Sequence, residues 1–173
     1  MKHPILGFSC VLLMGLSLQG CGLFLSDLEK LLETNVCQKC DLTGANLKGA
    51  DLTGTDLTKA NLWGASLNNA NLTEANLIGV NLKGADLTGT DLTEANLTEA
   101  NLIGANLKGA DLTGTDLTKA NLWGANLNNA NLTDADLIDA ILQNAENFNT
   151  ANTTGAKFCK TIMPDGITNN AGC

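Results

Sequence analysis

The apolar and polar residues of this chain follow a pattern that repeats every five positions. Every fifth residue from Leu42 to Leu142 is leucine, and a small residue, most often alanine, lies two positions before each leucine. The residue just before each leucine is asparagine or aspartate, except at Ser66 and Ile141. A period of five fits neither an α-helix nor a β-strand. The pattern therefore predicts a chain that turns a corner every five residues.

Longer spacings in the same region indicate how many corners complete one coil. Threonine recurs at positions 53, 73, 93, 113 and 133, and glycine recurs at 44, 64, 84, 104 and 124. Segment 46–75 recurs almost unchanged as 106–135. Residues twenty apart are therefore expected to be equivalent, so that four five-residue sides close one square coil.

This unit resembles the pentapeptide-repeat family, and the match runs without a gap from residue 41 to 145. The resemblance implies an all-β fold, a right-handed quadrilateral β-helix in which the leucine and the small residue point inward. Burial of each leucine contributes about 1.5–3 kcal/mol before conformational entropy is subtracted. Each coil contacts only its neighbours, so both ends are expected to need caps.

The N-terminal cap is expected within residues 21–36. Ser26 and Glu29 have capping-box spacing, and Leu28, Leu31 and Leu32 are expected to form one apolar face of a short helix. The β-helix is then expected to span residues 37–158. After Leu142 the pattern slips by one residue, with phenylalanines at 148 and 158 as central residues of a decaying repeat.

The remaining residues, 159–173, are expected to form a tail bracketed by a disulfide between Cys159 and Cys173. The stretch A-K-F-C-K-T-I-M-P-D-G at 156–166 resembles the ending of exported cyanobacterial members of the family. Cys37 and Cys40 occupy two inward positions. We interpret them as a structural disulfide or two buried thiols, with a redox motif as an alternative. A zinc site shared with the C-terminal pair is disfavoured, because five coils separate the pairs by over about 20 Å.

The first residues predict export. Lys2 and His3 precede an uncharged, mostly apolar run from residue 5 to 18, which is typical of a signal peptide spanning residues 1–20. The sequence L-Q-G-C at 18–21 resembles a bacterial lipobox and predicts lipidation of Cys21. The alternative is an uncleaved anchor, because residues 5–25 carry no charge and are long enough to span a bilayer. Both interpretations place the repeat near a membrane, in the periplasm or the thylakoid lumen.

Composition narrows the function. The net charge is −8, arginine is absent and aromatic residues make up 3% of the chain, which disfavours binding to nucleic acid. The only histidine is His3, in the leader. Serine and threonine recur as repeat positions rather than as unique ones. We therefore predict no enzyme, and no catalytic residue, cofactor or metal site.

The twenty-residue period sorts the outward side chains onto four sides. The side of Leu52 carries a net charge of −6 from six acids, some of which are expected to stack with like charge one coil apart. Trp63 and Trp123 share the side of Leu42, three coils apart. Both sets are candidate interaction surfaces, and the alternatives are a solubilising wall and a neutral copy made by the internal repeat. The acids are Asp51, Glu74, Asp91, Glu94, Asp111 and Asp134.

These observations favour a non-enzymatic, membrane-tethered scaffold outside the cytoplasm that binds a protein partner, with self-association left open. One alternative is an acidic mimic of DNA that binds a type II topoisomerase, as some members of the family do. The other is a weak cation-binding or redox accessory protein that uses the acidic sides or the Cys37 and Cys40 pair.

Overall fold

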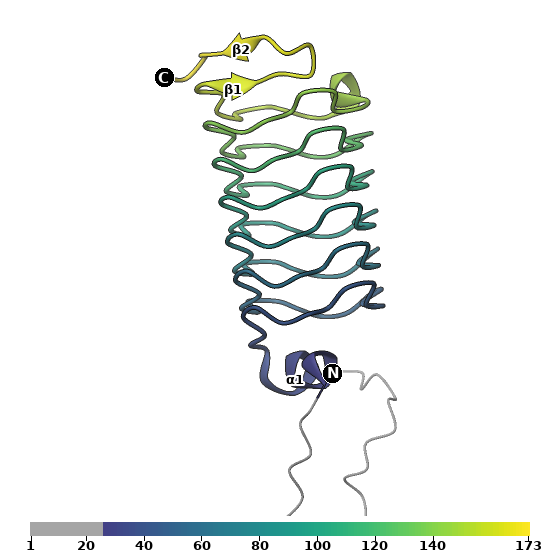
Figure 1. The fold of residues 1–173 in the computed structure, drawn as a ribbon. Helices are drawn as coiled ribbons and strands as arrows, with labels where there is room; N and C mark the ends of the chain where they lie inside the picture. Colours follow the sequence, from purple (N-terminus) through teal and green to yellow (C-terminus); the bar gives the residue numbers. More distant parts are fainter. Residues whose placement is uncertain (1–25) are drawn as a thin grey trace, which may run out of the picture.

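A computed structural model describes residues 26–173, which form a stack of coils with a cap at each end (Figure 1). Helix α1 (Asp27–Thr34) lies at the N-terminal end. The 3₁₀-helix η1 (Phe148–Thr150) and strands β1 (Thr161–Ile162) and β2 (Thr168–Asn169) lie at the other end. The predicted signal peptide and Cys21 lie outside the described residues.

Each corner of the coil is a four-residue turn that begins at a leucine. In the first of them, the backbone N–H of Ala45 donates to the carbonyl oxygen of Leu42 at 3.0 Å, and Gly44 has a φ of +63°. A positive φ at the third residue is what a type II turn requires. The same sign recurs at every fifth residue up to Asn144, at ten non-glycine residues as well as at glycines.

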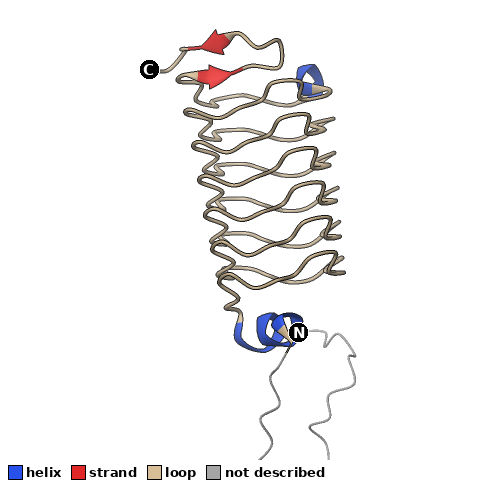
Figure 2. Ribbon diagram, in the orientation of Figure 1, coloured by secondary structure: helices blue, strands red, loops and turns tan. Residues whose placement is uncertain are grey.

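Successive coils pair through residues twenty apart, as predicted. Parallel bridges run from Asp41 with Asn61 to Asn126 with Glu146 without a break in the spacing. At the first of these, the N–H of Leu42 donates to the carbonyl oxygen of Asn61 at 2.8 Å. Each bridge is a single residue between two turns, so the walls appear as loops in Figure 2. The prediction of four sides per coil is confirmed.

The leucines fill the axis of the coil. All of them from Leu42 to Leu142 are at most 2% exposed, and nearly all the alanines beside them are buried as well. Thr55, Thr90 and Thr115 take the place of the small residue and are also fully buried. The core is therefore one continuous stack of aliphatic side chains.

The predicted slip of one residue lies in the last coil. Bridge spacing changes from twenty to twenty-one between the Asn126–Glu146 bridge and the Asn131–Asn152 bridge. The extra residue is accommodated in η1. Phe148 is only partly buried there, and its ring meets that of Phe158 edge to face, with centroids 6.3 Å apart. The phenylalanines thus cover the last coil rather than fill the axis as the leucines do.

Helix α1 covers the open end of the first coil. The predicted capping box is present: the N–H of Ser26 donates to Glu29 Oε2 at 2.9 Å, and the N–H of Glu29 donates to Ser26 Oγ at 3.3 Å. Leu31 is fully buried and Leu28 packs against the core. Leu32 is 46% exposed, so the expectation of a three-leucine face is wrong. Leu32 follows Leu31 directly and lies about 100° further round the helix.

At the C-terminal end a small hairpin covers the last coil. The N–H of Ile162 in β1 donates to the carbonyl oxygen of Ala140 at 2.9 Å. Strand β2 then pairs antiparallel with β1, with Thr161 opposite Asn169. Each paired strand is two residues long, so little unpaired edge is left for another chain. Within residues 26–173 no helix is both long and apolar enough to cross a bilayer.

Candidate interaction surfaces

The two tryptophans lie on the same side of the coil. The outward residues at the second position of the turn on the Leu42 side, which we call the tryptophan column, follow one another in successive coils. Backbone hydrogen bonds of 2.9–3.1 Å from the neighbouring glycines connect them. Trp63 is 54% exposed and Trp123 is 47% exposed. The column consists of Thr43, Trp63, Lys83, Ile103, Trp123 and Gln143.

Glycines line the tryptophan column along its length. The next residue of the turn is glycine in five successive coils on this side, whereas the corners of the other sides carry glycine in some coils and lysine, glutamate, aspartate or asparagine in others. A Cβ atom added to any of these five glycines would meet no atom within 4 Å. The surface beside the tryptophans, which we call the glycine ledge, is therefore open. The glycines are Gly44, Gly64, Gly84, Gly104 and Gly124.

The six acids of the Leu52 side, which we call the acidic face, lie two sides further along the coil. In a four-sided coil, sides two apart are opposite each other. The structure therefore separates the candidate residues into two surfaces that face away from each other, the tryptophan column and the acidic face.

Half of the acidic face consists of carboxylates held by their own turns. Asp111 Oδ1 accepts hydrogen bonds from the hydroxyl of Thr113 at 2.5 Å and from its N–H at 3.0 Å. The amide of Asn131, one coil on, donates to the same oxygen at 3.2 Å. This is an Asx turn, in which a short polar side chain bonds the backbone two residues on. Asp51 and Asp91 accept from the N–H of Thr53 and Thr93 in the same way.

Hydrogen bonds from these turns offset the repulsion expected between carboxylates that lie in adjacent coils. Asp91 and Asp111 are bridge partners in adjacent coils. The N–H of Thr93 bonds the carboxylate of Asp91 and lowers its pKa, although partial burial opposes the shift. The carboxylate is thus stabilised as an anion in spite of its charged neighbour. The sequence pattern D/N-L-T indicates that the aspartate bonds the threonine two residues on. The charges of the acidic face alone do not indicate this role.

Three other carboxylates have lowered pKa values for the same reason. The hydroxyl of Thr43 lowers the pKa of Asp41, and the hydroxyl of Thr58 lowers that of Asp56. Burial would raise the pKa of Asp116, but hydrogen bonds from threonines and the charge of Lys157 leave it lowered. These four aspartates, each of which directly precedes the leucine of a turn, therefore serve as structural anions.

The other acids of the acidic face occupy the left-handed corner position. Glu74, Glu94 and Asp134 have φ values of +56° to +57° and exposed side chains. On the neighbouring Leu57 side, Lys119 Nζ lies 3.9 Å from Glu99 Oε1. Exposed pairs of this kind contribute little to stability. The corner acids are the part of this wall that a basic partner would reach first.

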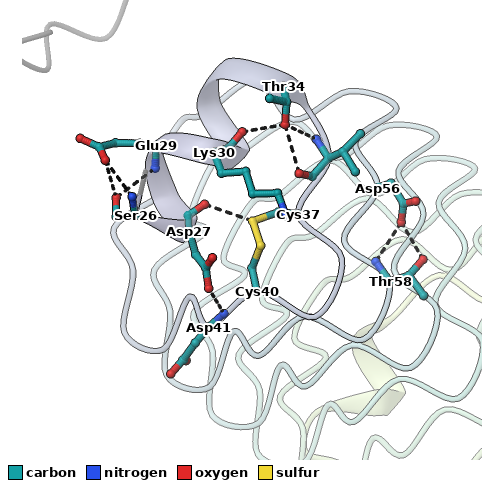
Figure 3. The surroundings of a disulfide bond; sticks show 11 residues. Ser26, Asp27, Glu29, Lys30, Thr34, Cys37, Cys40, Asp41, Asp56 and Thr58 are labelled. Atoms are coloured by element: carbon teal, nitrogen blue, oxygen red, sulfur yellow. Dashed lines mark hydrogen bonds between the residues drawn. A yellow bond between two sulfur atoms is a disulfide. The ribbon is translucent and has the colours of Figure 1, made fainter. Parts of the chain in front are cut away.

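Both predicted cysteine pairs are disulfide-bonded. Cys37 and Cys40 join beneath α1, where the Cys37 sulfur lies 3.1 Å from the carbonyl oxygen of Asp27 (Figure 3). Asp27 Oδ2 also accepts the N–H of Asp41 at 2.7 Å. Ligand atoms of Asp27, Cys37 and Cys40 lie within 4.8 Å of one another. Because the two sulfurs are bonded to each other, neither is a thiolate that could hold a metal ion.

The second disulfide joins Cys159 to Cys173 across fourteen residues. It ties the end of β2 and the chain terminus back to the last coil. The four cysteines of the described residues are thus all paired, and one pair lies at each end of the coil.

Comparison with known proteins agrees with this architecture. The family model for pentapeptide repeats matches residues 36–74, 75–114 and 115–146, with eight copies. No curated protein matches the chain.

Three solved structures are similar to it. HetL, a pentapeptide repeat protein involved in heterocyst differentiation regulation in Nostoc sp. PCC 7120, is 35% identical over 78% of this chain and 66% of its own, with a TM-score of 0.39. Rfr23 from Cyanothece 51142 is 32% identical over 75% and 91%, with a TM-score of 0.40. A pentapeptide repeat protein of the Arabidopsis thaliana thylakoid lumen is 32% identical over 63% and 70%, with a TM-score of 0.35.

Proposed function

Because the chain belongs to the pentapeptide-repeat family, we propose that it is a non-enzymatic interaction scaffold, exported and held at a membrane by its N-terminal segment. The observation that carries the export proposal is the pair of disulfides, one at each end of the coil. Disulfides form and persist in oxidising compartments. A periplasm or thylakoid lumen is consistent with both the disulfides and the apolar leader.

The chemistry of the walls supports a scaffold rather than an enzyme. A general acid needs a raised pKa to keep its proton near neutral pH. The aspartates with resolved shifts have lowered pKa values instead, because their turns donate hydrogen bonds to them. The same groups recur from coil to coil, so the wall offers repeated polar contacts.

The buried position of Cys37 and Cys40 supports a structural role over redox exchange. They are 0% and 3% exposed, and thiol–disulfide exchange needs access for an attacking thiolate. The DNA-mimic alternative has less support than the scaffold, because the two disulfides and the apolar leader favour an exported chain, whereas a type II topoisomerase acts on DNA inside the cell. Failure of the purified protein to inhibit a type II topoisomerase is the expected result.

Cell fractionation combined with intact mass spectrometry tests the proposal. The mature chain is expected to lack residues 1–20, to carry lipid on Cys21, and to show no thiol that reacts with an alkylating agent before reduction. A Cys21→Ser variant is the matched control, because it removes the lipid acceptor and leaves both disulfides in place. An unprocessed cytosolic chain with four alkylated thiols in residues 26–173 would reject the proposal.

The partner is expected to be a protein that contacts one wall of the coil. Crosslinking in intact cells, followed by mass spectrometry of the crosslinked peptides, identifies both the partner and the wall. Crosslinks are expected at exposed lysines of the coil such as Lys59 and Lys119. Intact cells that yield crosslinks only within the chain itself would argue against a scaffold.

A further inference from the structure

The tryptophan column brings two exposed tryptophans and an isoleucine onto a wall that is otherwise polar. Five large apolar side chains are exposed in residues 26–173, and the two on the Leu42 side are the tryptophans; the others are Leu32, Val36 and Ile167. Three coils at about 4.8 Å each place Trp63 about 14 Å from Trp123 along the axis. Ile103 lies between them, one coil from Trp123. The column is therefore straight and parallel to the axis.

We propose that the tryptophan column docks on the surface of an anionic phospholipid bilayer, so that the coil lies along the membrane. Tryptophan is suited to this position, because its ring is apolar while its indole N–H can stay hydrated at the level of the headgroups. Lys83 lies within the column, between Trp63 and Ile103, where its ammonium group would meet lipid phosphates. The open glycine ledge lets the tryptophans approach the bilayer without a neighbouring side chain in the way.

The distribution of charge favours this orientation. The Leu42 side carries Lys83 and Asp41, and the adjoining Leu47 side carries Lys48 and Lys108 against Asp86. These two sides are together the least negative part of the coil, whereas the Leu57 side, which adjoins the Leu42 side on its other edge, carries a net charge of −3. The acidic face is on the opposite wall, and repulsion from lipid phosphates falls off over about 8 Å at physiological ionic strength. An anionic surface would therefore accept the tryptophan column and repel the acidic face.

Because the N-terminal segment would hold the coil at the membrane, a weak contact between the tryptophan column and the bilayer is sufficient for docking. This step rests on the proposed tether at Cys21 or on the alternative anchor. Only a few residues separate Cys21 from Asp27, where α1 begins, so a tethered coil stays close to the bilayer. Tethering turns docking into an intramolecular event at high effective concentration. Two tryptophans, an isoleucine and a lysine are then enough to select one wall.

The chain contains two tryptophans in all, so its intrinsic fluorescence reports on the proposed contact directly. The full-length chain is reconstituted in vesicles containing phosphatidylglycerol, with and without lipids brominated on their acyl chains. We expect a blue-shifted emission and quenching by the brominated lipids. Trp63→Phe and Trp123→Phe should each leave a tryptophan that is quenched, because both residues face the same surface.

Lys83→Glu and Lys59→Glu form a matched pair, since each reverses one exposed lysine on a different side of the coil. Lys83→Glu is expected to weaken docking by about fivefold or more, because a lysine near an anionic surface contributes about 1 kcal/mol. Lys59→Glu should leave the quenching nearly unchanged.

Flotation of the same vesicles separates this proposal from the tether. A chain that floats with vesicles but shows neither a blue shift nor quenching overturns the docking proposal and leaves the tether intact. A chain that neither floats nor is quenched counts against both. A blue shift caused by isolated peptidoglycan, with none caused by vesicles, would identify a polysaccharide as the occupant and would also overturn the proposal.

Discussion

At the scale of single residues, the inward threonines show how local chemistry depends on position in the stack. Thr90 Oγ1 donates to the carbonyl oxygen of Leu67 at 2.7 Å, and Thr115 Oγ1 donates to that of Leu92 at 2.9 Å. Each acceptor lies twenty-three residues earlier, in the preceding coil. The same offset from Thr55 leads to residue 32, which belongs to α1. Thr55 Oγ1 is accordingly buried without a partner.

This difference predicts opposite effects of one substitution. Thr90→Val should lower the free energy of unfolding by about 1 kcal/mol, because it removes a buried hydrogen bond while the side chain keeps nearly the same shape. Thr55→Val should leave it unchanged or raise it by about 1 kcal/mol, because it removes an unsatisfied buried hydroxyl. Urea unfolding of both variants at equal protein concentration measures the difference. Equal losses at the two sites would contradict this account.

Backbone conformation at the corners leads to a second prediction. Gly104 has a φ of +62° with open space around it, and Glu94 has a φ of +56° but already carries a Cβ atom. Gly104→Ala should destabilise the coil by about 1 kcal/mol. The added methyl group meets no neighbour, so the cost comes from the left-handed backbone conformation, which disfavours alanine. Glu94→Ala, the control, should change stability by less than about 0.5 kcal/mol. Thermal unfolding distinguishes the two, and a larger loss at Glu94 would argue against backbone strain as the cause.

At the scale of elements, the caps differ from the coils in what holds them. The coils are fixed by a repeated ladder, whereas β1 and β2 depend on a short hairpin and the Cys159–Cys173 bond. Replacing both cysteines with serine should lower the free energy of unfolding by up to about 3 kcal/mol, because the disulfide no longer closes this fourteen-residue loop. Hydrogen exchange should quicken at Ile162, which bonds the last coil, and stay slow in the central coils. Uniform quickening along the whole coil would show that the caps and coils unfold as one unit.

Elements that repeat were predictable from the sequence, and those that break the repeat were predictable only in part. The spacing of leucine and alanine was enough to predict the core and four sides per coil, because a single error in register would expose every later leucine. The capping box of α1 was readable for a similar reason, since it is a local pattern. The place and form of the extra residue in η1 were not, because several turns near Phe148 could have absorbed it. The missing partner of Thr55 needed the position of α1 itself.

At the scale of the whole molecule, the aspartates make stability depend on pH. The pKa values of Asp56, Asp91 and Asp116 are lowered from an ordinary value of 3.8. Their stabilising effect is therefore complete above that value and is lost as the pH falls through the lower folded-state pKa values. The free energy of unfolding should fall as the solution is acidified below about pH 4.

Replacing these three aspartates with asparagine is the matched test. Asparagine occupies the same turn position in other coils, where its Oδ1 accepts the same N–H. The triple variant should keep the fold and show a shallower loss of stability on acidification. An unchanged slope would assign the pH dependence to other groups.

The spacing of the bridges also limits how such a molecule can change in length. An insertion of five residues would preserve the leucine axis but rotate everything after it by a quarter turn, and Trp123 would then leave the wall that it shares with Trp63. Sixty residues separate these tryptophans, a whole number of circuits, so the copied segment keeps its orientation. Growth by complete circuits thus lets evolution lengthen the particle and reproduce a useful wall in one genetic event. Insertion of fewer than twenty residues would lengthen the coil but move the later residues onto another wall.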